Sequence, residues 1–160
     1  MLSTTSLPCS VSNVQISTLA AIALDVARES NCISMHVGSV LSKGGHIVST
    51  GYNGSAKGDV NCCDLFTERG PDHTAWSDKR EIHSELNCLL HCPVDTKGTI
   101  MVTTHSPCWN CTKHMVAAGV KEIWFIERYY RMTDDEYSEV EGFCENMEVK
   151  FGPVPDQGAN

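Results

Sequence analysis

The order and spacing of two short polar motifs constrain this chain more than any other feature. His83-Ser84-Glu85 lies within residues 79–92, where apolar side chains recur at helical intervals, and Pro107-Cys108-Trp109-Asn110-Cys111 follows the apolar run 99–104. The first segment is predicted to be a helix that ends at Pro93, the run a strand, and Pro107 the start of a helix. We therefore expect a helix, a strand and a second helix around the two motifs.

The rest of the hydrophobic pattern indicates more strands and helices. Ser42-Lys43-Gly44-Gly45 separates two short apolar runs, which is typical of a β-hairpin. The other expected helices are 14–29 and 134–144, and the other expected strands are 37–41, 46–50, 121–126 and 148–151. Alternating strands and helices after a hairpin predict an α/β fold with a mixed sheet layered between helices.

The 160 residues are expected to form one domain. We predict that it spans 14–151, between a flexible N-terminal tail at 1–13 and an irregular C-terminal tail at 152–160. The segment Gly51–Asp72 is long for a loop in a compact domain, and loops of that length are usually functional or held in place.

Composition and charge argue against several classes of function. The net charge of −8 gives no reason to bind a long nucleic acid, although a local pocket can still hold one phosphate. No apolar run approaches the roughly 20 residues that cross a membrane. Residues 1–13 lack the features of a secretory signal, so the protein is expected to be cytoplasmic, with its nine cysteines reduced and some of them metal ligands.

His83, Cys108 and Cys111 are the residue types of a catalytic zinc site. One imidazole and two thiolates bind Zn²⁺ well, and three protein ligands leave the fourth tetrahedral position open for water. The two cysteines lie at a helix start, which favours thiolates, and can face one ion. A C-x-x-C alone is also typical of a redox pair or half of a zinc knuckle. Its combination with H-x-E and the proline favours a zinc deaminase.

Glu85 follows His83 by two residues and is expected to reach zinc-activated water rather than the ion. Zinc lowers the pKa of bound water to about 7, and a carboxylate beside it can act as general acid and base. We expect Glu85 to take the water proton, hydroxide to attack C4 of cytosine, and Glu85 to return protons to N3 and the leaving amine. The products are ammonia and a uracil compound.

The chain resembles a known enzyme family over 14–151. Residues 81–87, 103–111 and 119–122 resemble the cytidine and deoxycytidylate deaminase superfamily. Upstream, Val37-Gly38-Ser39-Val40, Gly51-Tyr52-Asn53-Gly54 and Asn61-Cys62-Cys63-Asp64 are similar to deoxycytidylate (dCMP) deaminases, including virus-encoded members.

The resemblance implies zinc-dependent hydrolysis of dCMP to dUMP, which supplies dTMP synthesis, in a three-layer α/β/α fold with a mixed five-stranded sheet. It also implies a homohexamer that dCTP activates and dTTP inhibits, the triphosphate carrying Mg²⁺. Neither a nucleic acid nor a membrane is an expected partner, and a virus-encoded member would act in the host cytosol.

The resemblance also assigns nucleotide contacts. Asn53 matches an Asn that reaches the sugar hydroxyl of the substrate, although Asn before Gly is also typical of a turn. Tyr129 matches a Tyr that helps close the nucleotide pocket, although an aromatic residue near a strand end is often only packing. Gly51, Tyr52 and Gly54 are candidate contacts of the allosteric nucleotide.

Cys32, Cys62, His73 and Glu81 match positions that bind a second, structural zinc in some viral relatives. Four protein ligands would close the coordination sphere, and the ion would hold the long segment 51–72 in place. Cys63 is an equally placed rival of Cys62, and four unrelated side chains are the alternative to a metal site.

Two positions depart from the pattern of these relatives: Ser84 stands where Ala is more usual, and Trp109 where a smaller residue is usual. The other histidines have no assigned role, although His105, two residues before Pro107, is expected to lie near the pocket. Candidates for contacts with a nucleotide phosphate are Arg28, Lys57, Arg128 and Arg131.

Two alternatives to a dCMP deaminase stay open. One is a deaminase of another nucleotide or of a polynucleotide, which the acidic charge disfavours. The other is a zinc-stabilised nucleotide sensor without turnover, which the presence of Glu85 disfavours, because a binding module needs no proton shuttle.

Overall fold

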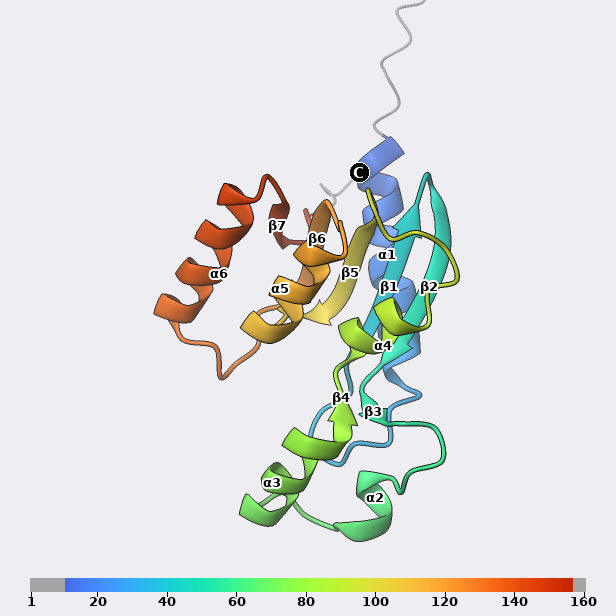
Figure 1. Cartoon of the computed structure of the whole chain (residues 1–160), viewed down its shortest axis with the longest axis vertical. Coiled ribbons are helices and arrows are strands. Elements are labelled where there is room, and N and C mark those ends of the chain that lie inside the picture. Colours follow the sequence, from blue (N-terminus) through green and yellow to red (C-terminus); the bar gives the residue numbers. More distant parts are fainter. Residues whose placement is uncertain (1–10, 157–160) are drawn as a thin grey trace, which may run out of the picture.

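A computed structural model describes residues 11–156 and contains a mixed sheet of five strands. The strand order is β2-β1-β5-β6-β7 (Figure 1). β1 is antiparallel to both β2 and β5, whereas β5, β6 and β7 are parallel. The strands span Gly38–Lys43 (β1), His46–Tyr52 (β2), Ile100–His105 (β5), Glu122–Glu127 (β6) and Lys150–Pro153 (β7).

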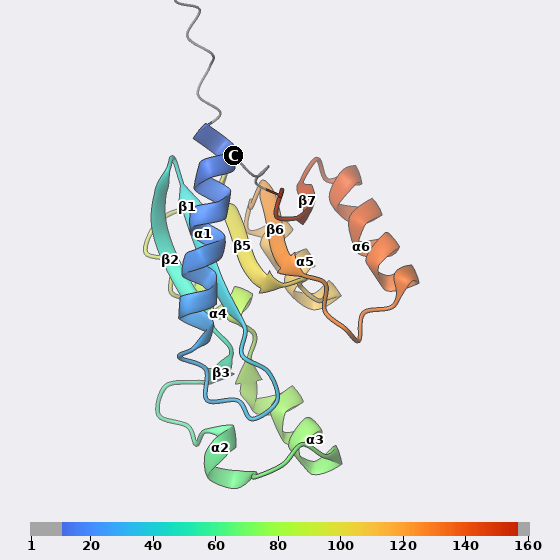
Figure 2. The ribbon, with the colours of Figure 1, turned by 180° about the vertical axis from the view of Figure 1, so that it is seen from behind.

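Helices cover both faces of the sheet, which confirms the predicted three layers. α1 (Val11–Ala27) packs on one face against β1 and β5, and Figure 2 shows it crossing in front of the sheet. α4 (Ser84–Leu90), α5 (Trp109–Ala117) and α6 (Asp134–Asn146) lie on the other face.

Each face of the sheet has its own hydrophobic core, because successive side chains of a strand point to opposite faces. Val40 and Val102 face α1, while Leu41 and Met101 face the three other helices. All four side chains are fully buried. The strands therefore give the motif-bearing helices a rigid platform.

A small lobe extends from one end of the sheet, at the bottom of Figure 1. It contains α2 (Cys62–Leu65), α3 (Pro71–Arg80) and the short antiparallel pair of β3 (Gly54–Ser55) with β4 (Glu81–Ile82). The segment 51–72, expected to be a loop, thus carries β3, α2 and the start of α3.

The structure corrects the predicted helix over 79–92. Glu81 and Ile82 are extended and pair with Ser55 and Gly54, so α4 begins only at Ser84. His83 is the N-cap of α4, with φ −64° and ψ 152°, rather than a residue inside a helix.

A helix and a strand extend into the two segments that were predicted to be tails. α1 begins at Val11, so 11–13 are helical, and β7 includes Gly152 and Pro153. Residues 1–10 and 157–160, the rest of those tails, lie outside the described residues.

Candidate metal and active site

A cavity of about 570 Å³ lies where the lobe meets the first turn of α4 and the segment between β5 and α5. Ligand pockets commonly measure roughly 300–1,000 Å³. Its walls include His83, Glu85 and Cys108, together with Asn53 and Tyr129, all singled out from the sequence. His105 also lines it, as expected.

His83, Cys108 and Cys111 form a compact group, which we call the catalytic trio. Their ligand atoms all lie within 4.8 Å of one another. The Nδ1 atom of His83 is 3.6 Å from Cys108 Sγ and 3.4 Å from Cys111 Sγ. Cys108 and His83 are the N-caps of α5 and α4, so two helix starts converge on one point.

The electrostatics of the trio favour a cation. Hydrogen bonds from Cys111 and His83 lower the pKa of Cys108 to about 4, and the backbone N–H of Cys111 donates to its sulfur at 3.4 Å. The hydrogen bond to Cys108 raises the pKa of His83 to about 9, and the same sulfur together with burial raises the pKa of Cys111. The trio thus concentrates negative charge on Cys108 and holds protons that a metal can displace.

The donor set fits zinc. One nitrogen and two sulfurs within reach of a single point are the ligand types of a three-coordinate catalytic site with a fourth position for water. Cys111 is buried and Cys108 half-buried, whereas the His83 side chain is exposed at the cavity wall. The site is therefore open to a molecule in the cavity.

Glu85 lies in the first turn of α4 with only 4% of its surface exposed, and it lines the same cavity. Burial raises the pKa of its carboxyl, and the nearby His83 opposes this shift. The Ser84 hydroxyl donates to Glu85 Oε2 at 3.1 Å. A buried carboxyl with a raised pKa is suited to accepting and returning a proton.

A second trio, Cys32, Cys62 and His73, is completely buried, and its ligand atoms also lie within 4.8 Å of one another. His73 Nε2 is 3.0 Å from Cys62 Sγ and 4.0 Å from Cys32 Sγ. These residues come from the segment after α1, from α2 and from α3. The three segments of the lobe therefore meet at this point.

The fourth predicted ligand of this group, Glu81, lies beside the second trio rather than within it. Its Oε2 accepts a hydrogen bond from Cys32 Sγ at 3.3 Å and another from Ser77 Oγ. Burial, with a contribution from the Glu81 charge, raises the pKa of Cys32 to about 11. Cys63, the rival of Cys62, is exposed and is not in the group, so the geometry favours Cys62.

Asn53 is 9% exposed and holds the backbone of the preceding loop. Its Oδ1 accepts from the Val37 N–H at 2.8 Å, and its Nδ2 donates to the Met35 carbonyl at 2.8 Å. An amide has two donors and two lone pairs, so one N–H and one lone pair remain. Asn53 thus holds the segment before β1, a structural role other than the turn considered from the sequence, and a sugar contact would use the remaining capacity.

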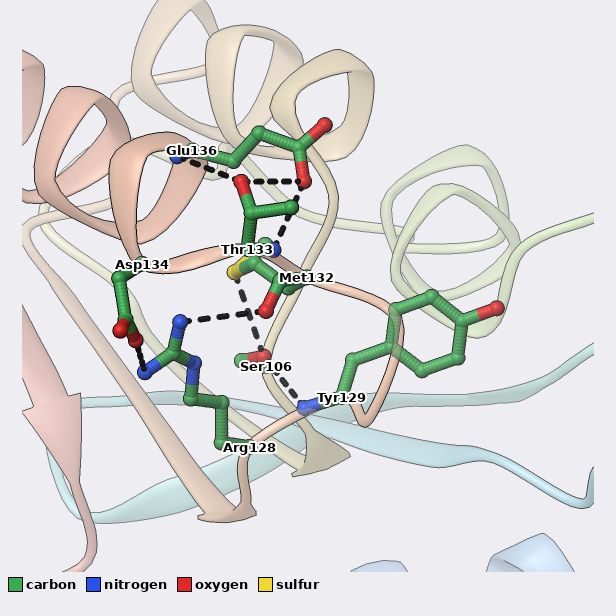
Figure 3. A network of polar contacts seen from close by, with 7 residues as sticks. All are labelled: Ser106, Arg128, Tyr129, Met132, Thr133, Asp134 and Glu136. Carbon is green, nitrogen blue, oxygen red and sulfur yellow. Dashed lines mark hydrogen bonds and ion pairs between the residues drawn. The ribbon is translucent and has the colours of Figure 1, made fainter.

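Tyr129 lies on a loop after β6 that hydrogen bonds fasten to the metal-binding motif (Figure 3). The Tyr129 N–H donates to Ser106 Oγ at 2.8 Å, and Ser106 is two residues before Cys108. Arg128 binds the Met132 carbonyl and the Asp134 carboxylate, at 3.1 and 2.8 Å. The loop is therefore held at the cavity mouth, with the Tyr129 ring pointing away from this network.

Two arginines line the cavity, Arg69 and Arg131. Of the four basic candidates for phosphate binding, only Arg131 is there. Arg128 pairs with Asp134, Arg28 is an exposed partner of Asp25, and Lys57 does not line the cavity. Sequence reasoning missed Arg69, which lies between α2 and α3 and reaches the cavity through the folding of the lobe. Its Nη2 donates to the Tyr130 hydroxyl at 2.6 Å.

The candidate allosteric residues Gly51, Tyr52 and Gly54 do not line this cavity. A Cβ on Gly51 would lie 2.4 Å from the Ser84 carbonyl oxygen and 2.5 Å from the Cys88 nitrogen. Close packing of α4 on β2 thus requires glycine there. Tyr52 is exposed at the end of β2, and Gly54 lies in β3.

Trp109 packs edge-to-face on Phe143 of α6, with ring centroids 5.0 Å apart. It lines a smaller neighbouring cavity of about 230 Å³, which shares Cys108, Tyr129 and Arg131 with the larger one. The large side chain therefore contributes to the outer side of the rim rather than to the main cavity.

None of the helices in residues 11–156 combines the length and the apolar character that a membrane span needs.

Comparisons with known proteins agree with this geometry. A family model described as the cytidine and deoxycytidylate deaminase zinc-binding region matches residues 13–127, a range that includes both trios and Glu85. The deoxycytidylate deaminases of Enterobacteria phages T4 and T2 are 35% and 33% identical, each over 72% of this chain and over 79% and 81% of their own lengths. The crystal structure of the dCMP deaminase from cyanophage S-TIM5 in apo form has a TM-score of 0.66 at 26% identity, covering 86% of this chain and 95% of that one.

Proposed function

Because this chain belongs to the cytidine and deoxycytidylate deaminase family, we propose that it hydrolyses dCMP to dUMP and ammonia. The observation that carries the proposal is the catalytic trio, with its ligand atoms within 4.8 Å of one another, beside the buried Glu85 on one cavity wall. The names of the phage relatives support dCMP as the substrate.

The residues of the site suit each step of this hydrolysis. Zinc held by the catalytic trio would supply a water acidic enough to lose a proton near neutral pH. Glu85 accepts that proton and delivers it to ring N3, then takes the proton of the hydroxyl group added at C4 and delivers it to the leaving amine. The C4–N bond breaks, a C4–O bond forms, and ammonia leaves.

The cavity also suits a negatively charged nucleotide. The side chains of Arg69 and Arg131 line the same cavity and provide positive charge to which a 5′-phosphate would bind. Asn53 would use its remaining hydrogen-bonding capacity on the sugar, and Tyr129 would close the open side. A free nucleotide therefore fits better than a polynucleotide, for which the chain has no excess of basic residues.

The second trio is proposed to bind a structural zinc. Its three ligands are buried, and the Glu81 carboxylate beside Cys32 would complete four protein ligands, which leaves no coordination position for a substrate. Such an ion would join the three segments of the lobe, each of which has few apolar residues of its own to bury.

The family resemblance supports further proposals about regulation and assembly. We propose activation by dCTP and inhibition by dTTP, with Mg²⁺ on the triphosphate, in a homohexamer that acts in the cytoplasm and supplies dUMP for dTMP synthesis. Gly51, Tyr52 and Gly54 remain the proposed effector contacts, although close packing of α4 also explains Gly51.

A direct assay tests the function. The zinc-loaded protein is incubated with dCMP, CMP, deoxycytidine and single-stranded DNA, with and without dCTP and Mg²⁺, and the uracil products are measured. We expect the highest kcat/KM for dCMP. Turnover of DNA alone would replace the proposed substrate, and no turnover of any compound would favour the nucleotide sensor.

A further inference from the structure

Glu85 is joined to the sheet by two buried hydroxyl groups. The Ser84 Oγ lies 3.1 Å from Glu85 Oε2 and 2.7 Å from the Oγ of Ser39. Ser39 is a residue of β1, and both serines are completely buried. A continuous line of polar atoms thus runs from the central sheet to the carboxylate of the proposed proton shuttle.

The chemistry of the three groups fixes the direction of these hydrogen bonds. An ionised carboxylate can only accept, so the single Ser84 proton is directed to Glu85 Oε2. The Ser84 oxygen is then left as an acceptor, and Ser39 must donate to it. Ser39 therefore donates to Ser84, and Ser84 donates to Glu85.

This arrangement limits the motion of a long side chain. Glu85 is anchored to α4 by its backbone, and Oε2 is tied through Ser84 to β1, an interior strand that pairs with β2 on one side and β5 on the other. Strands in the centre of a sheet are among the most rigid parts of a protein. A catalytic group held by a packed and hydrogen-bonded support keeps its productive geometry better than one held by rotamer preference alone.

We propose that Ser84 is a positioning residue, supported by Ser39, that holds Glu85 through Oε2 and leaves Oε1 to transfer protons. The proposal rests on the proposed deaminase function.

A neighbouring hydroxyl provides a matched control. Thr103 lies directly opposite Ser39 in the β1–β5 pairing, so it faces the same side of the sheet, and it is also completely buried. Within the part of the chain that the structure describes, its Oγ1 has no hydrogen-bond partner. Thr103→Val therefore removes a buried hydroxyl of the same layer that is not connected to Glu85.

The test compares Ser84→Ala, Ser39→Ala, the double variant and Thr103→Val as zinc-loaded proteins. For each we would measure kcat and KM for dCMP, zinc per chain, thermal unfolding, and dUMP binding by calorimetry. We expect Ser84→Ala to lower kcat about 10-fold, the effect of losing one hydrogen bond to a charged group. KM, zinc content and dUMP affinity should stay within about twofold, because the lost contact is to the shuttle and not to the nucleotide.

The double variant separates a connected chain from two independent packing effects. Ser39→Ala should lower kcat by about threefold, and the double variant should be no slower than Ser84→Ala, because Ser39 acts only through Ser84. Thr103→Val should keep the kcat of the unmodified protein.

Two results with Ser84→Ala would overturn the positioning role while leaving the deaminase function intact: a kcat within twofold of the unmodified protein, or a rise in KM in place of the fall in kcat. A third such result is a double variant whose loss of kcat equals the product of the losses in the two single variants. If the unmodified protein deaminates no cytosine compound, both proposals fall together, and the two kinds of failure are thereby distinguished.

Discussion

Glu85→Gln replaces one oxygen of a carboxylate by an amide nitrogen and hardly changes the volume of a side chain that is 4% exposed. Because the amide cannot accept and return the water proton, kcat should fall by about 10²- to 10⁴-fold, or about 2.7–5.5 kcal/mol of transition-state stabilisation. The carboxylate of Glu81, which also lines the cavity, is engaged by Cys32 and Ser77 and offers no replacement.

The same substitution lowers kcat but should not lower the stability of the metal-free protein. Burial raises the pKa of Glu85 in the folded protein above its ordinary value of 4.5. The stabilisation of the folded state by this group is therefore complete only below pH 4.5 and is lost as the pH rises through the raised pKa. Glutamine does not ionise. The metal-free variant should therefore match the unmodified metal-free protein near pH 4 and be at least as stable at pH 7.

Three measurements check this pair of expectations: steady-state kinetics with dCMP, zinc per chain by elemental analysis, and denaturant unfolding of the metal-free proteins at several pH values. Glu145→Gln is the control, since Glu145 is an exposed carboxylate of α6 that lines neither of the two cavities. A kcat within tenfold of the unmodified protein would refute the shuttle role of Glu85. A variant that is less stable at pH 7 but not at pH 4 would refute the account of its burial.

Further predictions concern the metals and the phosphate. Cys62→Ser should reduce zinc per chain from two to one, whereas the exposed neighbour in Cys63→Ser should leave it at two; equal loss in both variants would contradict the second trio. Binding of zinc to the catalytic trio at pH 7 should release about two protons, one from the His83 imidazole, with its pKa of about 9, and one from the Cys111 thiol, whose pKa is raised. The release is measured with a pH indicator in weak buffer on the Cys62→Ser protein. A release below one proton would refute the assigned charges. Arg131→Gln should raise KM for dCMP about 10-fold and hardly change KM for deoxycytidine, which has no phosphate. The control Arg28→Gln should change KM for neither substrate. An equal effect of Arg131→Gln on both substrates would argue against a phosphate contact.

Sequence reasoning predicted the sheet and the proximity of Cys108 and Cys111 because both depend on local patterns. The strands β1, β2, β5 and β6 begin and end within two residues of their predicted bounds, since each is a short apolar run between turn residues. The spacing of Cys108 and Cys111 at a helix start brings their ligand atoms together whatever the rest of the fold does.

The break before Ser84 could not be predicted in the same way. The apolar residues Ile82, Leu86 and Leu89 follow a helical interval, which favoured one continuous helix over 79–92. The extended conformation of Glu81 and Ile82 depends on pairing with Gly54 and Ser55, almost 30 residues earlier in the chain. Tertiary pairing of this kind overrides local periodicity and leaves no signal in a short window.

That break has a consequence for how the two metal-binding groups are related. Side chains of an extended segment alternate in direction, so Glu81 and His83 point to the same side, and both line the cavity. Glu81 contacts Cys32 of the second trio, and His83 belongs to the catalytic trio. A continuous helix would have turned these two side chains about 200° apart around its axis. The short strand β4 therefore ties the lobe directly to the position of His83, so a metal bound to the second trio would affect the geometry around His83.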